Sequence, residues 1–253
     1  MPTGVDLGRV AVVLARPRIP ENVGAAARAM KNMGIRKLVL VSPKDRDLAR
    51  MVKMATTSAM DVIEEMKVFE TMEEALAPFS YVVGTTARTG SHRKTVLDPG
   101  GVARSLIPIS RENDIALVFG PEDKGLSNSD LRFCHVLVTI PTSDFASLNL
   151  AQAVLLVCWE VSRASLDTPP EWAPRLATRH ELDAMYASLK DVLTRIGFIN
   201  AENPEHWLDN IRRFFSRVSL TARDVKVIRG ICRQIDWYTE KRLQALLGQK
   251  KEA

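Results

Sequence analysis

Two loops in the second half of the sequence carry residues suited to binding a ligand through backbone groups. The first loop, Gly120–Leu126 (GPEDKGL), follows the apolar run Ile115–Phe119, and the second, Pro141–Ser147 (PTSDFAS), follows the apolar run Val136–Ile140. Short β-branched runs bounded by turn residues predict buried strands. Because ligands of an open α/β sheet bind beyond the carboxyl ends of its strands, we expect both loops to lie side by side at one site.

The glycines of the first loop do not form a known nucleotide-binding motif. Gly120 and Gly125 have the spacing of the phosphate-binding loop G-x-x-x-x-G-K-[ST], but Leu126 and Ser127 follow, so the phosphate-binding lysine is missing. The sequence also contains no G-x-G-x-x-G fingerprint, which leaves a dinucleotide-binding Rossmann motif without support. The ligand is therefore expected to be held in another way.

The N-terminal part predicts the first strand and helix of the domain that carries these loops. Arg9–Ala15 reads as a strand and Ala25–Met33 as a helix, with Asn22 suited to cap that helix and Gly34 to end it. Further strands are expected at 38–41 and 81–84, and further helices at 48–66 (broken or double), 72–76 and 102–107. Strands that alternate with helices predict an α/β fold, a parallel sheet with helices on both faces.

A long helix is expected to open at Ser147–Asn149, directly after the second loop. It is apolar on two sides, with Leu148, Ala151, Leu155 and Cys158 on one and Leu150, Val154, Val157 and Val161 on the other. A helix that is apolar all round contacts more than one layer, so we expect it to be central and fully covered.

A proline-rich segment divides the chain. Residues 166–174 (LDTPPEWAP) break any helix, and beyond them the pattern is helical at 180–197, 204–216 and 221–247, with Asn203 and Thr221 as expected N-caps. We therefore predict a first domain at 1–165, a linker at 166–177 and a small all-helical domain at 178–253.

Composition and charge favour an intracellular protein with a polyanionic partner. The net charge is +5, and residues 171–253 carry 15 Lys and Arg against 11 Asp and Glu. The three cysteines are widely spaced, which predicts a reducing cytoplasm and no metal site. No signal peptide or membrane span is recognisable, so no membrane association is expected.

Three motifs, in this order, resemble those of the SPOUT class of RNA methyltransferases: Asn22-x-Gly24-Ala-Ala-Ala-Arg28, FGPEDKGLSN and IPTSDFASLNLAQAV. The resemblance implies an α/β fold with a deep C-terminal trefoil knot that binds S-adenosylmethionine, and a homodimer joined through the helix after Ser147. Connection rules alone would not predict a knot.

The resemblance also implies roles for single residues. The catalytic group would comprise Asn22, Arg28, Glu122, Ser147 and Asn149. A guanidinium is not readily deprotonated, so Arg28 would hold the target phosphate and stabilise charge on the ribose oxygen. Asn22 and Ser147 remain equally interpretable as helix caps. Glu122 could be a solvated loop acid, a partner of Arg28 or part of the surroundings of the methyl donor. The methyl donor would lie against Thr85, Thr86, Ala87, Gly120, Ile140, Ala146, Ser147 and Leu148.

The helical part contains Ile196-Gly197-Phe198, the run 212–217 (RRFFSR) and Ile228-Arg229-Gly230-Ile231. With these residues it resembles the second domain of a branch of the class whose members methylate a ribose 2′-hydroxyl in the tRNA anticodon loop. The resemblance implies cytidine or uridine at position 32 as the target. In the last helix of this part the basic residues Arg223, Lys226, Arg229 and Arg233 fall on one side, opposite Val225, Ile228, Cys232, Ile235 and Tyr238. We expect these basic residues to bind RNA together with others of both domains: Arg16, Arg18, Arg88, Arg212, Arg213 and Arg217. A solvated basic face is the competing interpretation.

Two departures from the family pattern and two further functions stay open. Pro121 stands where that branch often has arginine, and the loop between Ile140 and Ser147 is one residue shorter than expected. Both loops flank the site, which leaves the target nucleotide undetermined. The alternatives are a ribosomal RNA 2′-O-methyltransferase of the same class and a non-catalytic RNA-binding dimer.

Overall fold

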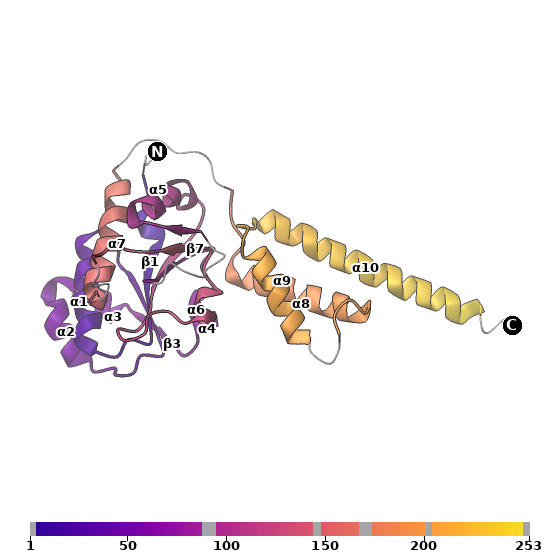
Figure 1. Cartoon of the computed structure of the whole chain (residues 1–253), viewed down its shortest axis with the longest axis horizontal. Coiled ribbons are helices and arrows are strands. Elements are labelled where there is room, and N and C mark those ends of the chain that lie inside the picture. The colour runs from indigo at the N-terminus through magenta and orange to yellow at the C-terminus, as the bar shows by residue number, and fades with distance from the viewer. Residues whose placement is uncertain (1–3, 88–94, 144–147, 167–173, 201–203, 250–253) are drawn as a thin grey trace. The chain divides into compact units, whose positions relative to one another are not determined.

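The chain forms two compact units, Met1–Leu176 and Ala177–Ala253. The computed structural model describes residues 4–87, 95–143, 148–166, 174–200 and 204–249 (Figure 1). Residues 174–176 belong to the first unit, where the buried Asn113 side chain accepts a hydrogen bond from the Leu176 amide at 2.5 Å and donates one to the Pro174 carbonyl at 3.3 Å. Each unit is described by itself below.

The first unit is built on a sheet of seven described strands in the order β3-β2-β1-β6-β4-β7-β5. Every neighbouring pair is parallel, as the alternation of strands and helices predicts. Two short strands, β3 and β5, were not predicted, and β7 ends two residues earlier than expected. The strands are β1 (Val10–Ala15), β2 (Lys37–Val41), β3 (Lys67–Phe69), β4 (Tyr81–Thr85), β5 (Val96–Leu97), β6 (Ile115–Phe119) and β7 (Val136–Val138).

Helices cover both faces of this sheet, which confirms the predicted fold class. Along β1, Val10, Val12 and Leu14 enter one hydrophobic cluster, whereas Ala11, Val13 and Ala15 enter the cluster on the opposite face. Figure 1 shows α1, α2, α3 and α7 on one side of the strands and α4 and α6 on the other. The α-helices described in this unit are α1 (Pro20–Asn32), α2 (Leu48–Ala55), α3 (Met60–Glu64), α4 (Met72–Leu76), α5 (Pro99–Ile109), α6 (Asn128–Leu131) and α7 (Leu150–Ala164).

Helix α1 begins five residues earlier than predicted, so the interpretation of Asn22 as its cap is wrong. Pro20 is the first helical residue, a position for which its fixed φ and missing N–H are suited, and Ile19 makes no side-chain cap. Asn22 therefore lies in the first turn with its side chain available to the site. Gly24 allows the contact with α2, since a Cβ there would lie 2.0 Å from the Met51 carbonyl oxygen.

Helix α7 begins at Leu150, later than predicted, because Asn149 caps it. The Asn149 side chain accepts a hydrogen bond from the Ala151 amide at 2.9 Å, and the Gln152 side chain accepts one from the Asn149 amide at 3.2 Å. The prediction of burial on all sides is wrong for a single copy of the chain. The side of α7 away from the sheet exposes three large apolar residues, Leu155, Leu156 and Trp159.

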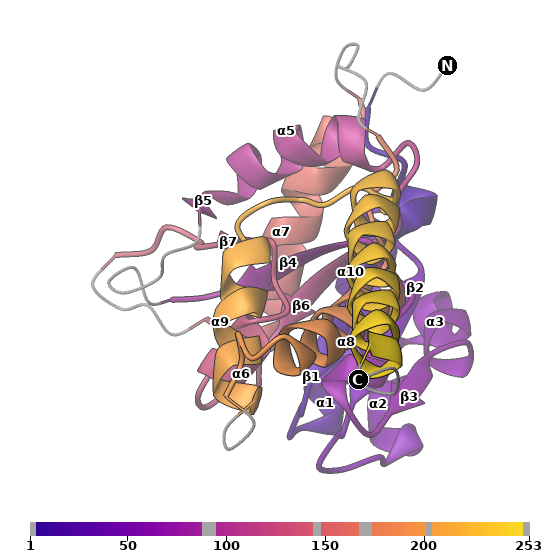
Figure 2. The same cartoon turned by 90° about the vertical axis from the view of Figure 1, so that its right-hand side faces the viewer.

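The second unit consists of three described helices, α8 (Arg179–Arg195), α9 (Pro204–Phe215) and α10 (Ala222–Gln249), each with bounds close to those predicted (Figure 2). Its small core contains Ala177, Leu182, Met185, Tyr186, Leu208 and Val225. Thr221 caps α10 as predicted, accepting a hydrogen bond from the Asp224 amide at 3.1 Å. Tyr238, expected on the buried side of α10, is instead 54% exposed. No helix among the described residues is long and apolar enough to cross a membrane.

Candidate active site

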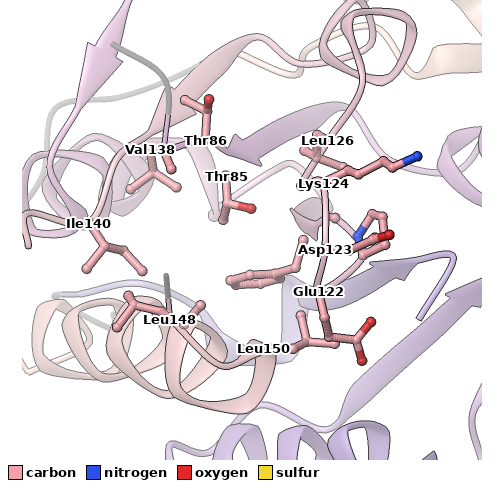
Figure 3. Close-up of a pocket in the computed structure, with 16 residues that line it drawn as sticks. Thr85, Thr86, Glu122, Asp123, Lys124, Leu126, Val138, Ile140, Leu148 and Leu150 are labelled. Carbon is pink, nitrogen blue, oxygen red and sulfur yellow. The ribbon is translucent and has the colours of Figure 1, made fainter. Parts of the chain in front are cut away.

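A cavity of about 320 Å³ opens at the carboxyl ends of β4, β6 and β7. Figure 3 shows Ile140 and Leu148 on one side of it and Glu122 and Asp123 across from them. Six of the residues predicted to bind the methyl donor line this cavity: Thr85, Thr86, Ala87, Gly120, Ile140 and Leu148. The other two, Ala146 and Ser147, lie outside the described residues, as does Arg88.

The loop after β6 folds back on itself to form one wall. A Cβ on Gly120 would lie 2.2 Å from both the Gly125 carbonyl carbon and the Leu126 amide nitrogen, so the backbone closes over the position of a side chain. Gly125 has φ +64° and donates its N–H to the Pro121 carbonyl at 2.9 Å. Both glycines are therefore required by the turn itself.

The polar groups at the end of β4 are fixed by neighbouring strands. The Thr85 hydroxyl donates to the Val118 carbonyl at 3.1 Å, the Thr86 amide donates to the Val138 carbonyl at 2.9 Å, and the Thr139 hydroxyl donates to the Thr86 carbonyl at 2.9 Å. These bonds hold the cavity wall rigid. The cavity is also lined by five apolar residues: Leu126, Val138, Ile140, Leu148 and Leu150. Apolar side chains next to backbone polar groups suit a neutral heteroaromatic ring.

Beside the cavity, three side chains from distant parts of the chain form one hydrogen-bonded network. The side-chain NH2 group of Asn22 donates a hydrogen bond to the Glu122 carboxylate at 2.9 Å. The side-chain oxygen of Asn22 accepts one from the side-chain NH2 group of Asn149 at 3.0 Å. The second oxygen of Glu122 accepts from the backbone N–H of Arg18 at 3.0 Å. The structure thus joins three of the five predicted catalytic residues.

Arg28 lies outside this network, so the interpretation of Glu122 as its partner is wrong. Glu122 is engaged by Asn22 and Arg18, whereas Arg28 is exposed on α1 and makes no ion pair with any described residue. Its neighbours Ala26, Ala27 and Ala29 are buried, so α1 contacts the domain through its small residues and leaves the guanidinium free.

Sequence reasoning missed a link between the loop after β1 and helix α6. Arg16, directly after β1, has φ +50°, and its guanidinium forms a bidentate ion pair with Asp130 of α6. Asp130 also accepts from the Ser127 amide at 2.8 Å and the Ser127 hydroxyl at 2.7 Å. Burial opposes ionisation of Asp130, but the hydrogen bonds from Arg16 and Ser127 outweigh it and hold the pKa of this carboxyl below its usual value of 3.8.

Asp130→Asn is expected to lower the free energy of unfolding by about 1–3 kcal/mol at pH 7, because an amide cannot accept all these donors. The folded-state pKa of Asp130 is lowered, so the stabilisation is present above the unfolded value of 3.8 and is lost as the pH falls through the folded value. Urea unfolding followed by circular dichroism at pH 7 and pH 3 measures both effects. The control Glu70→Gln, which breaks the exposed pair with Arg46, should cost under about 1 kcal/mol. A pH-independent cost for Asp130→Asn would contradict this assignment.

The predicted RNA-binding residues differ in how freely they are presented. Arg16 is paired with Asp130 and Arg18 with Asp123. Arg212 is half-buried, 5.7 Å from the centroid of the Tyr186 ring and 3.5 Å from Asp209. The remaining residues of the second unit are exposed, namely Arg213, Arg217, Arg223, Lys226, Arg229 and Arg233.

Comparison with known proteins agrees with this geometry. Residues 9–159 match the model of the SpoU rRNA Methylase family, and residues 180–246 match that of the tRNA methyltransferase TrmJ C-terminal domain. The chain belongs to the SpoU methylase family, and within it to the TrmJ branch. The resemblance inferred from the three motifs is therefore confirmed.

Individual relatives extend over both units. The tRNA (cytidine/uridine/adenosine-2′-O-)-methyltransferase TrmJ of Pseudomonas aeruginosa is 37% identical, with 89% of this chain and 93% of the relative covered. The crystal structure of TrmJ from Z. mobilis ZM4 has a TM-score of 0.77 at 30% identity and covers 89% of this chain and 98% of that one. The SpoU methyltransferase AviRb of Streptomyces viridochromogenes, in complex with AdoMet, shares the fold at 20% identity and a TM-score of 0.50 over 62% of this chain and 58% of that one.

Proposed function

We propose that this chain transfers a methyl group from S-adenosylmethionine to the ribose 2′-hydroxyl of a cytidine or uridine in tRNA. The observation that carries the proposal is the Asn22–Glu122–Asn149 network beside a backbone-lined apolar cavity. The name of the Pseudomonas aeruginosa relative, which covers both units, supports tRNA as the substrate and the 2′-hydroxyl as the acceptor.

The cavity fits the methyl donor on structural grounds. The turn at Gly120 brings backbone groups to the surface where a Cβ would otherwise stand, and Ile140 and Leu148 supply apolar contacts for an adenine ring. When bound, the donor supplies an electrophilic methyl group. The residues around it have to orient the two reactants and exclude water.

The side chains of the network would position the ribose acceptor. Glu122 is held by hydrogen bonds to both oxygens, so Asn22 and the Arg18 amide are fixed relative to the cavity. Asn149 joins the network to the N-terminus of α7, which places that helix end at the site. Arg28, which makes no ion pair with a described residue, would bind the target phosphate and stabilise the negative charge that develops on the ribose oxygen. It remains positively charged throughout, because a guanidinium does not deprotonate in proteins.

The second unit would hold the tRNA. Arg223, Lys226, Arg229 and Arg233 are exposed on α10, whereas Val225 and Cys232 of the same helix are buried. Each phosphate contact releases counterions, so binding through this face should weaken steeply as the salt concentration rises.

The enzyme would act in the cytoplasm as a homodimer with a trefoil knot around its donor site. The support for the dimer is the apolar outer side of α7, where Leu155, Leu156 and the 49% exposed Trp159 would otherwise face water. The support for the knot is membership of the SpoU methylase family, together with the position of the cavity between the loops that such a knot comprises.

Trp159→Asp is expected to weaken dimerisation at least about 30-fold, since a central aromatic anchor contributes roughly 2 kcal/mol or more. Sedimentation velocity over a micromolar concentration series measures the change. The matched control is Leu166→Asp, just beyond α7, where the side chain is highly exposed and the dimer should persist. A wild-type chain that is monomeric and fully active would exclude the dimer.

The proposed function is tested by incubating the full chain with labelled methyl donor and total RNA. Label is expected in tRNA, at a 2′-O-methylated cytidine or uridine located by mass spectrometry of nuclease fragments. Label in ribosomal RNA would instead identify the alternative substrate. Donor binding by calorimetry without transfer to any RNA would indicate a non-catalytic protein.

A further inference from the structure

The exposed side of α10 carries a regular row that contains more than basic residues. Its members are spaced four, three, four and four residues apart and therefore lie on one stripe of the helix, about 22 Å long at 1.5 Å per residue. This stripe faces away from the buried Val225 and Cys232. We call it the cationic row: Lys226, Gly230, Arg233, Trp237 and Lys241.

The three cations of the cationic row have no acidic partner among the described residues. Lys226, Arg233 and Lys241 form no ion pair with any residue that the structure describes. The acids of the same helix are occupied elsewhere, because Asp224 binds the Thr221 cap and Asp236 and Glu240 lie 2.8 and 3.9 Å from Arg195. The row thus presents three positive charges that no described carboxylate compensates.

Trp237 adds a flat apolar surface between two of these charges. Its side chain is 52% exposed on the helix, one turn after Arg233, and the Lys241 ammonium lies 4.8 Å from the ring centroid. Aromatic rings next to cations bind single-stranded nucleic acids, because bases stack on the ring while phosphates meet the charges. In a duplex the bases are already stacked and unavailable.

Gly230 is the second, independent sign of a ligand. It lies inside a 28-residue helix, where glycine lowers helix stability relative to alanine. A Cβ at this position would meet no described atom within 4 Å, so packing among the described residues does not explain the glycine. A residue without a side chain instead allows another backbone to approach closely at this point.

We propose that the cationic row is a track for an unpaired segment of RNA, with phosphates at Lys226, Arg233 and Lys241 and a base stacked on Trp237. The sugar-phosphate backbone crosses α10 at Gly230. The inference rests on the proposed function, since it specifies which feature of the tRNA the second unit recognises. A neighbouring row of exposed apolar residues, Val227, Ile231 and Tyr238, would suit a protein partner. The uncompensated charges of the cationic row favour the polyanion.

The test compares binding of a labelled 12-nucleotide oligouridine and a blunt RNA duplex of the same length by fluorescence anisotropy, using the full chain. Trp237→Ala is expected to weaken oligouridine binding by roughly 5- to 100-fold with an unchanged salt slope, and Trp237→Phe to retain most of the affinity. Lys226→Gln with Arg233→Gln should reduce the salt slope by about 1.4. The control Tyr238→Ala, equally exposed on the neighbouring row, should change affinity less than twofold.

Gly230→Ala provides a readout that a merely structural role would not produce. The unfolding temperature should rise, because alanine favours the helix, while oligouridine affinity should fall at least fivefold because the methyl group obstructs the crossing backbone. Equal affinity of Trp237→Ala and wild type for oligouridine would overturn the proposal. So would a change in sedimentation coefficient upon Trp237→Ala with RNA binding intact, which would identify a protein interface.

This inference and the proposed function fail separately. Wild-type chain that binds oligouridine through the cationic row but transfers no methyl group to tRNA would refute the proposed function alone. If the Trp237→Ala and Gly230→Ala variants methylate tRNA as efficiently as the wild type, the RNA track alone is refuted.

Discussion

Replacing Arg28 with alanine is expected to lower the rate of methyl transfer by at least about 100-fold while leaving the affinity for S-adenosylmethionine unchanged. Arg28 is exposed on α1 and is absent from the residues that line the donor cavity. It makes no ion pair with a described residue, so its removal leaves no buried partner unsatisfied and should not unfold the chain. Loss of the Arg28 side chain should therefore lower only the rate of methyl transfer, the step in which negative charge develops on the acceptor oxygen.

Two measurements separate this role from a structural one. Single-turnover methylation of tRNA reports the rate, and isothermal titration reports donor affinity. Arg28→Lys keeps the charge but not the bidentate geometry, so we expect it to recover only part of the rate. A matched surface control is Arg36→Ala, which removes only an exposed contact with Asp61 at 3.7 Å. An Arg28→Ala variant that keeps most of its turnover would show that the charge at this position is not used.

The strands and helices that follow hydrophobic periodicity could be predicted from the sequence. The β6 strand Ile115–Phe119 and the α4 helix Met72–Leu76 have the predicted bounds, and the helices of the second unit differ by one or two residues. Period-two and period-3.6 patterns are local, so they need no knowledge of distant partners. The short β3 and β5 gave no such signal, because three and two residues are too few to show a period.

Errors at the helix ends came from choosing between competing local signals. Both Pro20 and Asn22 favour a helix start, and the structure uses Pro20 as the first helical residue. Similarly, Ser147 and Asn149 are both good caps, and α7 uses Asn149. In each case the Asn side chain also enters the network around Glu122. The contact between Asn22 and Glu122 spans 100 residues, and the one between Asn149 and Asn22 spans 127. Tertiary contacts of this kind cannot be predicted from the spacing of residues along the sequence.

The partners of charged residues could not be predicted for the same reason. The motif suggested Glu122 with Arg28, but both Glu122 oxygens are taken by Asn22 and the Arg18 amide. Arg16 was expected to bind RNA, yet it has a left-handed backbone conformation and its side chain is paired with Asp130. Ion-pair choice depends on backbone conformation and loop packing, which a residue-type pattern does not specify.

Gly120→Ala is expected to weaken donor binding by roughly 10- to 100-fold, corresponding to about 1–3 kcal/mol of overpacking. The new Cβ would lie 2.2 Å from two backbone atoms, the Gly125 carbonyl carbon and the Leu126 amide nitrogen, and neither can rotate away as a side chain would. The loop must open to admit the methyl group. That movement displaces the wall of the cavity opposite Ile140 and Leu148, and it pulls Glu122 away from Asn22.

A second glycine provides the matched control. In Gly100→Ala the new Cβ would meet Arg104 at 3.5 Å and Glu160 at 3.6 Å, which are ordinary contacts with flexible side chains, so donor affinity should be unchanged. Isothermal titration of S-adenosylmethionine into both variants and the wild type measures the difference, and circular dichroism confirms that each variant is folded. Wild-type affinity in Gly120→Ala would mean that the loop after β6 does not form the donor site. If Gly120→Ala loses methyl transfer but keeps its affinity for the donor, the loop after β6 would instead act on the ribose acceptor, through Glu122.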